Sequence, residues 1–583
     1  MRNAKIVCTL GPASDDRATI RALADAGMSV ARLNASHGSP EHRAEVIDRI
    51  RAVDGATESP LAAMVDLQGP EVRTAPLDEP IVLETGSEVR FAVGDTATPE
   101  EVGLSLPIDA AEVGDTILLD DGRIEATVSA VEDDAVVARV DSGGPLGGRK
   151  GVNVPGVDLD IDLITDKDRE ELRIAAEKNA DFVAASFVRN GADVYAISDA
   201  LEEFGGDIPV VAKIERAGAV ENLDGIVDAA YGVMVARGDL GVECPLEDVP
   251  MVQKRIIRKC IDAGVPVITA TEMLDSMVHA RRPTRAEASD VANAVLDGTD
   301  AVMLSAETAV GDHPVRVVET MDRIVREVEA SGEYYENREQ RVPTASEGSR
   351  TEALARASRY LARDIGAAAV VAASESGYTA RKTAKFRPGV PVVATTPNDR
   401  VRRQLALSWG VNAQYADYSN GVDAIIDGAV SAAMDAGVAR SGDTVVVLSG
   451  MMTELEGTNS TNMLKVHVAA EAVATGRKIV GGRVAGPVHR SADGDLSALP
   501  EGALLALSAD FEGEFAGDAS KLAGIVDARP GMTGYPALVA RELDVPMVSG
   551  APLPDDLEDG AIVTLDAERG VIYEGDVLRA ARE

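Results

Sequence analysis

Long hydrophobic runs and cysteines are both scarce in this sequence. The longest apolar runs, such as Ala367–Ala373, are far shorter than the roughly 18 residues that a membrane-spanning helix needs. The first residues, Met1–Lys5, lead directly into a strand-like segment and show no signal-peptide pattern. The three cysteines, Cys8, Cys244 and Cys260, lie far apart beside apolar residues, which favours buried free thiols. Together these absences predict a cytoplasmic protein.

Basic residues are also in short supply. The sequence has 57 lysines and arginines against 97 aspartates and glutamates, which gives a formal net charge of −40. This charge argues against nucleic acid and anionic membrane surfaces as partners. Acidic chains with few aromatic residues, here 3%, are sometimes disordered. The regular strand and helix patterns instead favour a folded protein with an acidic, hydrated surface, as in halophilic organisms.

The 583 residues are too many for one hydrophobic core, so several domains are expected. Residues 1–330 contain eight short runs, mostly apolar and β-branched, that end in polar residues or glycine. Such runs are typical of parallel strands covered on both faces. The expected strands are Ala4–Thr9, Met28–Asn34, Leu61–Asp66, Asp181–Ser186, Ile208–Lys213, Gly232–Ala236, Val265–Ala270 and Asp300–Leu304.

Helical segments with apolar residues at i, i+3 and i+4 alternate with these strands. They are Asp15–Ala26, Glu41–Val53, Asp166–Asn179, Ala217–Asp228, Met251–Ala263, Arg285–Asp297 and Pro314–Val328. Eight strands alternating with helices predict an α/β protein built on a (β/α)₈ TIM barrel.

One interval of the chain has a different pattern. Between the third and fourth expected strands, residues 80–140 form short alternating runs separated by turn residues such as Asp121-Gly122. We expect a small β-barrel domain inserted at the catalytic face of the TIM barrel, where it could act as a lid. The alternative is an inserted domain without a functional role.

The rest of the chain predicts two more domains. Tyr334–Ser349 is polar, lacks periodicity and contains Pro343, so we expect a linker. Elements of a second α/β domain are expected at Glu352–Ile365, Ala368–Ala372, Arg381–Phe386, Pro391–Thr395, Asp399–Ser408, Val411–Tyr415 and Thr444–Leu448. After Gly476 the chain has fewer helical segments, and strands are expected at Ala503–Leu507 and Val545–Val548. The expected domains are the barrel (1–72 and 152–335), the lid (73–151), the α/β domain (349–472) and a fourth domain (476–583).

The end of the fifth strand carries residues suited to phosphate chemistry. Lys213 and Glu215 stand two residues apart and therefore share a face at the barrel mouth, where barrel enzymes place their sites. After the sixth strand, Gly238 would let a backbone N–H approach a ligand closely, and Asp239 adds a second carboxylate. Two carboxylates suit Mg²⁺ or Mn²⁺, which prefer hard oxygen ligands. A solvated charge pair and an ordinary turn are the alternatives for these segments.

Other strand ends add further cations and oxygens. Arg32 carries a guanidinium fork suited to phosphate, and Asn34 and Ser36 offer neutral oxygens that a monovalent cation could use. Asp66 and Arg73 add another acid and another phosphate-binding base after the third strand. The last two strands end in Thr269–Glu272 and Ser305–Thr308. The convergence of these strand ends at one mouth is stronger evidence for a site than any single motif.

Long segments of the sequence resemble the pyruvate kinase family, in order, between about residues 4 and 470. They are Lys5–Ser14 (KIVCTLGPAS), Arg32–Gly38 (RLNASHG), Gly69–Thr74 (GPEVRT), Lys150–Gly156 (KGVNVPG), Lys213–Glu215 (KIE), Val235–Glu243 (VARGDLGVE), Ile268–Met277 (ITATEMLDSM), Pro283–Ala309, Ser376–Arg381 and Gly457–Asn459. The resemblance implies the family's reaction, in which phosphoenolpyruvate and ADP give pyruvate and ATP in the last step of glycolysis. It also implies a homotetramer.

By this resemblance, Glu215 and Asp239 hold the Mg²⁺ ion, and Lys213 neutralises charge on the transferred phosphoryl group and on the enolate oxygen. Arg32 and Arg73 would steady the phosphoryl group. These roles agree with the physics of phosphoryl transfer, which depends on positioning and charge neutralisation more than on covalent chemistry.

The resemblance also implies how the rest of the substrate is held. Backbone N–H groups around Gly238 and Asp239, together with Thr271, would bind its carboxylate. Thr271, Ser305 and Glu307 are candidates for the relay that protonates the enolate, and the donor is left open.

The nucleotide and a potassium ion would share one loop. The resemblance places the nucleotide along Asn34, Ala35, Ser36, His37, Arg73 and Lys150. From the sequence alone, His37 is expected to be a hydrogen-bonded loop residue. The implied K⁺ ligands are Asn34, Ser36, Asp66 and Leu67. Glu71 is typical of K⁺-dependent family members, although Leu67-Gln68 replaces their usual Thr-Lys. We expect K⁺ dependence.

The second α/β domain resembles the family's effector domain. Ser374, Ser376, Gly377 and Thr379 belong to a segment that looks like its phosphate-binding loop, which suits a phosphorylated effector. Glu375 adds repulsion there, and a purely structural turn is the alternative.

The last hundred residues resemble the phosphohistidine domain of phosphoenolpyruvate synthases, through residues 531–537 and 545–550. The phosphorylated histidine of that domain is replaced here by Tyr535. Because a phenol cannot replace an imidazole as a phosphocarrier, we expect a structural or regulatory domain.

Two other functions are compatible with parts of the sequence. One is a catalytically dead relative that binds metabolites as a regulator; the intact Lys213, Glu215, Asp239, Arg32 and Arg73 argue against it. The other is a different barrel enzyme that acts on phosphoenolpyruvate, or a synthase; the absent histidine argues against the synthase.

The charge predicts that stability depends on salt. At about 1 M salt the Debye length falls to ~3 Å, so repulsion among surface carboxylates is screened. We expect the melting temperature, measured by differential scanning fluorimetry, to fall on dialysis from molar KCl into low salt. Full activity and an unchanged melting temperature in low salt would contradict this expectation.

Overall fold

The computed structural model describes residues 2–157, 159, 161–417, 421–450, 461–470 and 472–578. The family-like segment Gly457–Asn459 lies outside these residues. The chain forms two compact units. The first comprises Met1–Ala345, Ala384–Arg387 and Asp399–Ala413, and the second comprises Ser346–Thr383, Pro388–Asn398 and Gln414–Glu583. Among the described helices, none is long and apolar enough to cross a membrane.

Eight parallel strands close into a barrel in the first unit, in the order β1-β16-β15-β14-β13-β12-β3-β2. Their bounds are β1 Lys5–Leu10, β2 Val30–Asn34, β3 Ala62–Asp66, β12 Phe182–Ala185, β13 Val210–Ile214, β14 Gly232–Ala236, β15 Val267–Ala270 and β16 Ala301–Leu304. Nearly every strand residue is buried, as strands covered on both faces require. The eight predicted strands, and the predicted TIM barrel, are confirmed.

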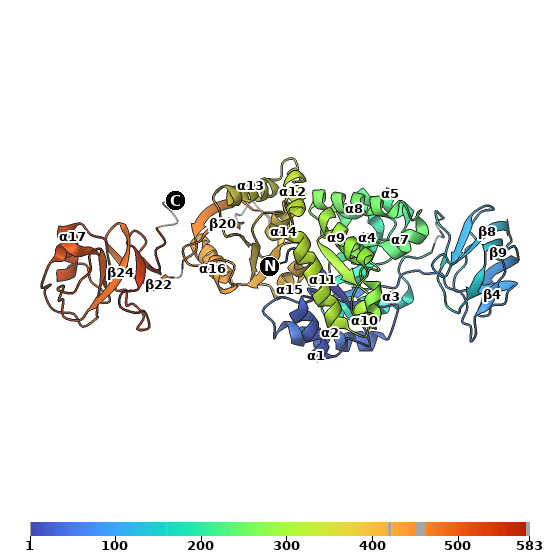
Figure 1. Cartoon of the computed structure of the whole chain (residues 1–583), viewed down its shortest axis with the longest axis horizontal. Coiled ribbons are helices and arrows are strands. Elements are labelled where there is room, and N and C mark those ends of the chain that lie inside the picture. The colour runs from blue at the N-terminus through green and yellow to red at the C-terminus, as the bar shows by residue number, and fades with distance from the viewer. Residues whose placement is uncertain are drawn as a thin grey trace. The chain divides into compact units, whose positions relative to one another are not determined.

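Helices surround the barrel (Figure 1). They are α1 Arg17–Ala26, α2 Pro40–Asp54, α3 Asp166–Glu177, α4 Gly191–Glu203, α5 Ala217–Glu221, α6 Leu223–Ala229, α7 Arg237–Glu243, α8 Val249–Ala263, α9 Arg285–Asp297, α10 Ala306–Ala309, α11 Pro314–Glu329 and α12 Gly332–Gln340, with the 3₁₀ turn η1 Asp275–Val278. Thr165 and Thr284 form capping boxes that fix where α3 and α9 begin.

Three details differ from the sequence-based expectation. The helix predicted over Ala217–Asp228 is two helices that meet at Asn222. The helix α4 was not predicted. The predicted linker Tyr334–Ser349 is wrong over its first half, because α12 extends to Gln340 and Tyr334 is buried, where its hydroxyl accepts a hydrogen bond from Trp409 Nε1 at 3.0 Å.

The N-terminal ends of the strands are covered by a late segment of the first unit. The short helices α15 Asp399–Gln404 and η2 Leu405–Leu407 place Ala406 and Leu407 in one hydrophobic cluster with side chains from the barrel interior. Arg403 Nε lies 2.9 Å from the carboxylate of Asp181, which directly precedes β12. This cover leaves the C-terminal ends of the strands as the open face of the barrel.

Residues 73–151, all of which the structure describes, contain strands and turns but no helix. The strands are β4 Ile81–Leu83, β5 Glu88–Val93, β6 Glu101–Leu104, β7 Thr116–Leu119, β8 Ile124–Val131, β9 Ala135–Ser142 and β10 Gly144–Leu146, with β11 Val152–Asn153 just beyond. They form a six-stranded sheet, β11-β7-β8-β9-β5-β6, and a two-stranded sheet, β10-β4, around a separate hydrophobic core. The inserted β domain is confirmed as part of the fold.

The second unit contains two sheets. The first has the order β19-β18-β17-β20-β21, in which β21 runs antiparallel to β20. Its elements are α13 Arg350–Asp364, β17 Ala369–Ala373, α14 Tyr378–Lys385, β18 Val392–Thr396, β19 Val411–Tyr415, α16 Val422–Asp435, β20 Thr444–Ser449 and β21 Met463–Val468. The predicted α/β arrangement is confirmed, with α16 and β21 as additions.

The C-terminal sheet has eight strands in the order β22-β29-β28-β24-β25-β26-β27-β23. They are β22 Ala472–Thr475, β23 Arg477–Val480, β24 Arg483–Ser491, β25 Ala503–Leu507, β26 Leu522–Asp527, β27 Met547–Ser549, β28 Ile562–Asp566 and β29 Val571–Glu574. One helix, α17 Tyr535–Leu543, begins at Tyr535, whose ring packs edge-on against Phe515 at 5.3 Å between centroids. The four-domain division of the chain stays a prediction.

Candidate active site

Lys213, on β13 at the open face of the barrel, is held by two carboxylates. Its Nζ lies 2.8 Å from Glu215 Oε1 and 3.4 Å from Asp66 Oδ1, and it donates a hydrogen bond of 2.7 Å to Ser186 Oγ. The side chain is only 12% exposed. Burial disfavours the charged ammonium, but the two carboxylates outweigh burial and raise the pKa of Lys213 above its ordinary value. The site therefore contains a permanent buried positive charge.

A continuous chain of polar contacts joins this lysine to the neighbouring strands. Asp66 Oδ2, at the end of β3, lies 2.5 Å from Arg32 Nε on β2. Arg32 Nη1 in turn donates to Thr9 Oγ1 on β1 at 2.8 Å. Burial alone would raise the pKa of Asp66, yet Arg32 and Lys213 hold it below its usual range. The contacts cross the ends of β1, β2, β3, β12 and β13, so the positions of these charges depend on barrel closure.

Of the two predicted metal ligands in this mouth, Glu215 is buried and Asp239 is exposed. Glu215 Oε2 accepts a hydrogen bond of 2.6 Å from the backbone N–H of Phe187, which has a left-handed φ of 57°. Burial and then the nearby charge of Glu215 raise the pKa of Asp239 to about 7. Asp239 lies in the first turn of α7. The repulsion that Glu215 exerts on Asp239 would favour a cation beside the two carboxylates.

These residues fit a divalent metal with few protein ligands. The described residues contain no group of three or more His, Cys, Asp or Glu side chains arranged as a metal site. Mg²⁺ often uses only one or two carboxylates and completes its shell with waters and substrate oxygens. Glu215 and Asp239 supply that pair, and their mutual repulsion would be relieved by the ion.

The predicted K⁺ ligands lie on adjacent strands. Asp66 Oδ1 is buried and accepts no hydrogen bond from any residue that the structure describes, although Lys213 approaches it as an ion pair. Asn34 Oδ1 accepts the backbone N–H of Ser36 at 3.0 Å, and Ala35 N–H donates to Asp66 O at 2.8 Å. The Leu67 carbonyl already accepts from Ser186 Oγ at 2.8 Å. A monovalent cation at Asp66 would therefore share this oxygen with the Lys213 ammonium.

The structure keeps Arg73 and Lys150 in pairs of their own. Arg73 donates to Glu71 Oε2 from Nε at 3.0 Å and from Nη2 at 2.6 Å, and to the carbonyl of Arg149 at 2.9 Å. Lys150 Nζ lies 2.7 Å from Asp120 Oδ1 in the inserted domain, and this contact lowers the pKa of Asp120. These partners orient both bases, and each base retains further N–H groups that could bind a ligand.

Thr271 occupies a strained turn that Arg237 supports. The backbone φ of Thr271 is 76° and that of Glu272 is 53°, values rare for residues with side chains. Arg237 donates to Thr271 O at 2.7 Å and to Ala270 O at 3.0 Å, and pairs with Asp290 at 2.7 Å. Such strain persists only where the surroundings hold it, and it is common at ligand sites. Arg237 lies in the family-like segment Val235–Glu243, but its contacts with this turn could not be predicted from the sequence.

Ser305 and Glu307 are joined at the end of β16. The backbone N–H of Ser305 donates to Glu307 Oε2 at 2.6 Å, and that of Leu274 donates to Glu307 Oε1 at 3.0 Å. Burial raises the pKa of Glu307, while these hydrogen bonds act in the opposite direction. With both oxygens occupied, Glu307 ties two loops together in this structure.

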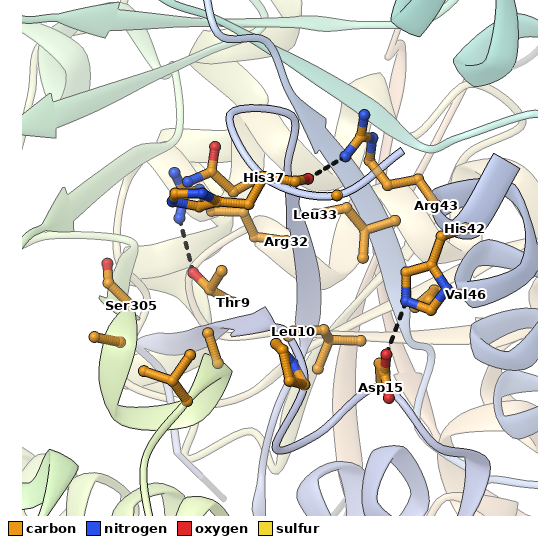
Figure 2. Close-up of a pocket in the computed structure, with 17 residues that line it drawn as sticks. Thr9, Leu10, Asp15, Arg32, Leu33, His37, His42, Arg43, Val46 and Ser305 are labelled. Atoms are coloured by element: carbon orange, nitrogen blue, oxygen red, sulfur yellow. Dashed lines mark hydrogen bonds and ion pairs between the residues drawn. The ribbon is translucent and has the colours of Figure 1, made fainter. Parts of the chain in front are cut away.

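A cavity of about 590 Å³ opens beside these strand ends. Figure 2 shows Arg32 and His37 close together and Ser305 to their lower left; all three line the cavity. His42 Nε2 and Asp15 Oδ2, 2.8 Å apart, contribute another wall. Of the predicted residues, Arg32, Asn34, His37 and Ser305 line it. Gly11 and Pro12, which also line it, lie in the family-like segment Lys5–Ser14 but were given no role there. Sequence analysis missed Asp15, His42, Arg43 and Val46, because they come from a loop and a helix without a recognisable motif.

A second cavity, of about 320 Å³, lies beside the predicted effector loop. Ser374 and Glu375 line it, together with Asp417, hydroxyl side chains and glycines; none of its described lining residues is Lys, Arg or His. Thr379 N–H donates to Ser374 Oγ at 3.3 Å, and Thr379 Oγ1 shares a hydrogen bond with Thr461 Oγ1 at 2.8 Å. The loop is therefore internally hydrogen-bonded, and its cavity is acidic.

Lys213 and Arg32 lie beside carboxylates at the open face of a TIM barrel, an arrangement suited to an enzyme that acts on anionic substrates. Three family profiles match the chain: "Pyruvate kinase, barrel domain" over residues 1–318, "Pyruvate kinase, alpha/beta domain" over 352–467 and "PEP-utilising enzyme, mobile domain" over 499–570. The last match agrees with the predicted likeness of the C-terminal region to a phosphohistidine domain.

Individual relatives extend over nearly the whole chain. A protein named pyruvate kinase from Geobacillus stearothermophilus is 41% identical, covering 98% of this chain and 99% of its own length. One from Staphylococcus epidermidis is 40% identical and covers 99% of both. The crystal structure of a pyruvate kinase from Cryptosporidium parvum superposes with a TM-score of 0.75 at 36% identity, covering 80% of this chain and 96% of that one. The chain belongs to the pyruvate kinase family and is a phosphotransferase.

The packing of Gly238 gives a test of this site. A Cβ at Gly238 would lie 2.9 Å from Thr271 Cγ2, whereas one at Gly241 on the same helix would meet nothing closer than 3.6 Å. We expect Gly238→Ala to displace Thr271 and to lower phosphotransferase kcat/KM roughly 10- to 100-fold. Gly241→Ala is the matched control and should retain activity. Equal activity of the two variants in steady-state assays would show that the contact with Thr271 does not matter.

Proposed function

We propose that this enzyme transfers the phosphoryl group of phosphoenolpyruvate to ADP and yields pyruvate and ATP. The observation that carries the proposal is the buried, permanently charged Lys213 between Asp66 and Glu215, next to Arg32. A reaction that moves a phosphoryl group and leaves an enolate develops negative charge on both fragments. A preorganised cation in a site shielded from water stabilises that charge without reorganisation during the reaction.

Each group at the mouth then has a distinct task. Arg32 orients the phosphoryl group, and Lys213 neutralises charge on it and on the enolate oxygen. Backbone N–H groups at Gly238 and Asp239, together with Thr271, bind the carboxylate. Glu215 and Asp239 would hold Mg²⁺ or Mn²⁺, which supplies additional charge neutralisation when bound.

The nucleotide is assigned to the loop Asn34–His37 and the cavity beside it. Arg73 and Lys150 join this assignment through their further N–H groups. Ser305, Glu307 and Thr271 remain candidates for the proton relay, among which Ser305 lines the cavity.

Several further properties are proposed from membership of the family and not from contacts between residues of this chain. They are the place of the reaction in glycolysis, a homotetramer, a phosphorylated effector at Ser374–Thr379, a cytoplasmic location and a regulatory or structural C-terminal domain. The acidic lining of the effector cavity would weaken binding of any phosphorylated ligand that relied on those residues alone.

Replacement of Lys213 tests the proposed chemistry. We expect Lys213→Met to lower kcat for phosphoenolpyruvate and ADP roughly 100- to 1,000-fold, the usual cost of removing one preorganised charge-stabilising group. Lys178→Met is the control, because Lys178 forms a surface pair with Asp48 at 2.6 Å on the outside of the barrel. Near-normal turnover of folded Lys213→Met enzyme would refute the assigned role.

Potassium dependence is tested by ion replacement. Because Asn34 and Asp66 are directly paired in the register of β2 and β3, we expect a monovalent cation bound by both residues to support the loop that carries Asn34 and Ser36. Activity should fall severalfold when tetramethylammonium replaces K⁺ and Na⁺ at constant ionic strength. Equal activity in the two buffers would mean that no monovalent cation is needed.

A further inference from the structure

A buried ion pair lies directly behind the cavity loop. Arg43, near the start of α2, is 4% exposed, and Glu171 on α3 is completely buried. Arg43 Nε donates to Glu171 Oε2 at 2.6 Å, and Arg43 Nη2 pairs with Glu171 Oε1. The guanidinium is therefore locked by both carboxylate oxygens, in the fork geometry that only arginine provides.

The locked guanidinium has one further partner, the backbone carbonyl of His37, to which Arg43 Nη1 donates (Figure 2). This carbonyl belongs to the tight turn Asn34–Gly38. Within the turn, Ser36 N–H donates to Asn34 Oδ1 at 3.0 Å, and Gly38 has a φ of 73°. Arg43 and His37 both line the 590 Å³ cavity. The ion pair thus connects the helical layer of the barrel to the loop that shapes the cavity.

Stability alone does not account for this pair. Removing two charges from water is costly, and apolar residues of similar volume often replace such pairs without loss of stability. A pair of this kind fixes the orientation of side chains. Glu171 orients the Arg43 guanidinium, and Arg43 in turn holds the His37 carbonyl in position. Arg43 still has two N–H groups beyond those that bind Glu171 and His37.

We propose that Arg43, oriented by Glu171, is a positioning residue for the nucleotide. It fixes the His37 carbonyl and thereby keeps Asn34–Gly38 in the conformation that receives the nucleotide. This inference rests on the proposed function, since it assumes that the cavity binds ADP. It predicts an effect on ADP rather than on phosphoenolpyruvate, because Lys213 and Thr271 are held by other contacts.

The same helix offers a matched control. Arg51, two turns further along α2, pairs with the buried Asp181 at 2.7 Å and donates to the carbonyl of Asn179 at 2.6 Å. It therefore combines the same two kinds of partner as Arg43. Arg51 is not among the residues that line the cavity. Loss of Arg51 should cost stability but leave the nucleotide loop in place.

The experiment compares Arg43→Met and Arg51→Met in the full-length enzyme. Calorimetry gives the Kd for MgADP, and steady-state kinetics gives KM for each substrate and kcat. A charge-assisted hydrogen bond is lost from the loop, so we expect Arg43→Met to weaken ADP binding and raise KM for ADP about tenfold. KM for phosphoenolpyruvate should stay within about twofold, and Arg51→Met should bind ADP like the wild type.

Two conservative variants make the outcome decisive even if Arg43→Met does not fold. Arg43→Lys keeps the charge without the fork, and Glu171→Gln keeps the shape without the charge; each should weaken ADP binding less than Arg43→Met. Unchanged ADP affinity in all folded variants, or an equal loss in Arg51→Met, overturns the positioning role. A wild-type enzyme that neither binds ADP nor transfers a phosphoryl group to it would instead overturn the proposed function.

Discussion

The site depends on the burial of one positive charge. An ammonium group almost removed from water is costly unless carboxylates pair with it, and Lys213 meets both Asp66 and Glu215. Asp66 also holds Arg32, which reaches Thr9. These contacts run along the ends of five neighbouring strands, so the charges can be in register only when the barrel is closed. Closure of the barrel during folding therefore also places the charged groups of the site in their final positions.

The two faces of the barrel have contrasting roles. At the N-terminal ends of the strands, Ala406 and Leu407 join the interior cluster, and Arg403 pairs with Asp181. Carboxylates there have arginine partners and serve packing. At the other face, the pKa of Asp239 is raised, in part by the nearby charge of Glu215. A carboxylate whose charge is disfavoured in this way is what a metal-dependent site requires.

Much of the fold could be predicted because its signals are local. The eight buried strands could be predicted because each is a short apolar run in the sequence. Helix α9 begins at the predicted residue because Thr284 and Glu287 form a capping box. The linker prediction was wrong at α12 because the segment is mostly polar, and its sequence gives no sign that Tyr334 is buried. The break at Asn222 also lacks a sequence signal, since the apolar spacing continues through it.

The sequence predicted which residues form the candidate site, but it predicted only some of the contacts between them. Lys213, Glu215 and Arg32 lie in motifs at strand ends, and strand order brings them together. Arg43 and Glu171 are 128 residues apart, so no local pattern relates them. Nor could the sequence show that Arg73 and Lys150 are held by Glu71 and Asp120. Such pairings are decided by helix packing and by the inserted domain, not by the motifs.

³¹P NMR of the purified protein with phosphoenolpyruvate, ADP, Mg²⁺ and K⁺ in molar KCl tests the proposed phosphoryl transfer most directly. We expect the phosphoenolpyruvate signal to disappear while the γ-phosphate signal of ATP grows in equal amount, with one pyruvate formed per ATP. Loss of phosphoenolpyruvate to inorganic phosphate without ATP, or no reaction by folded protein, would contradict it.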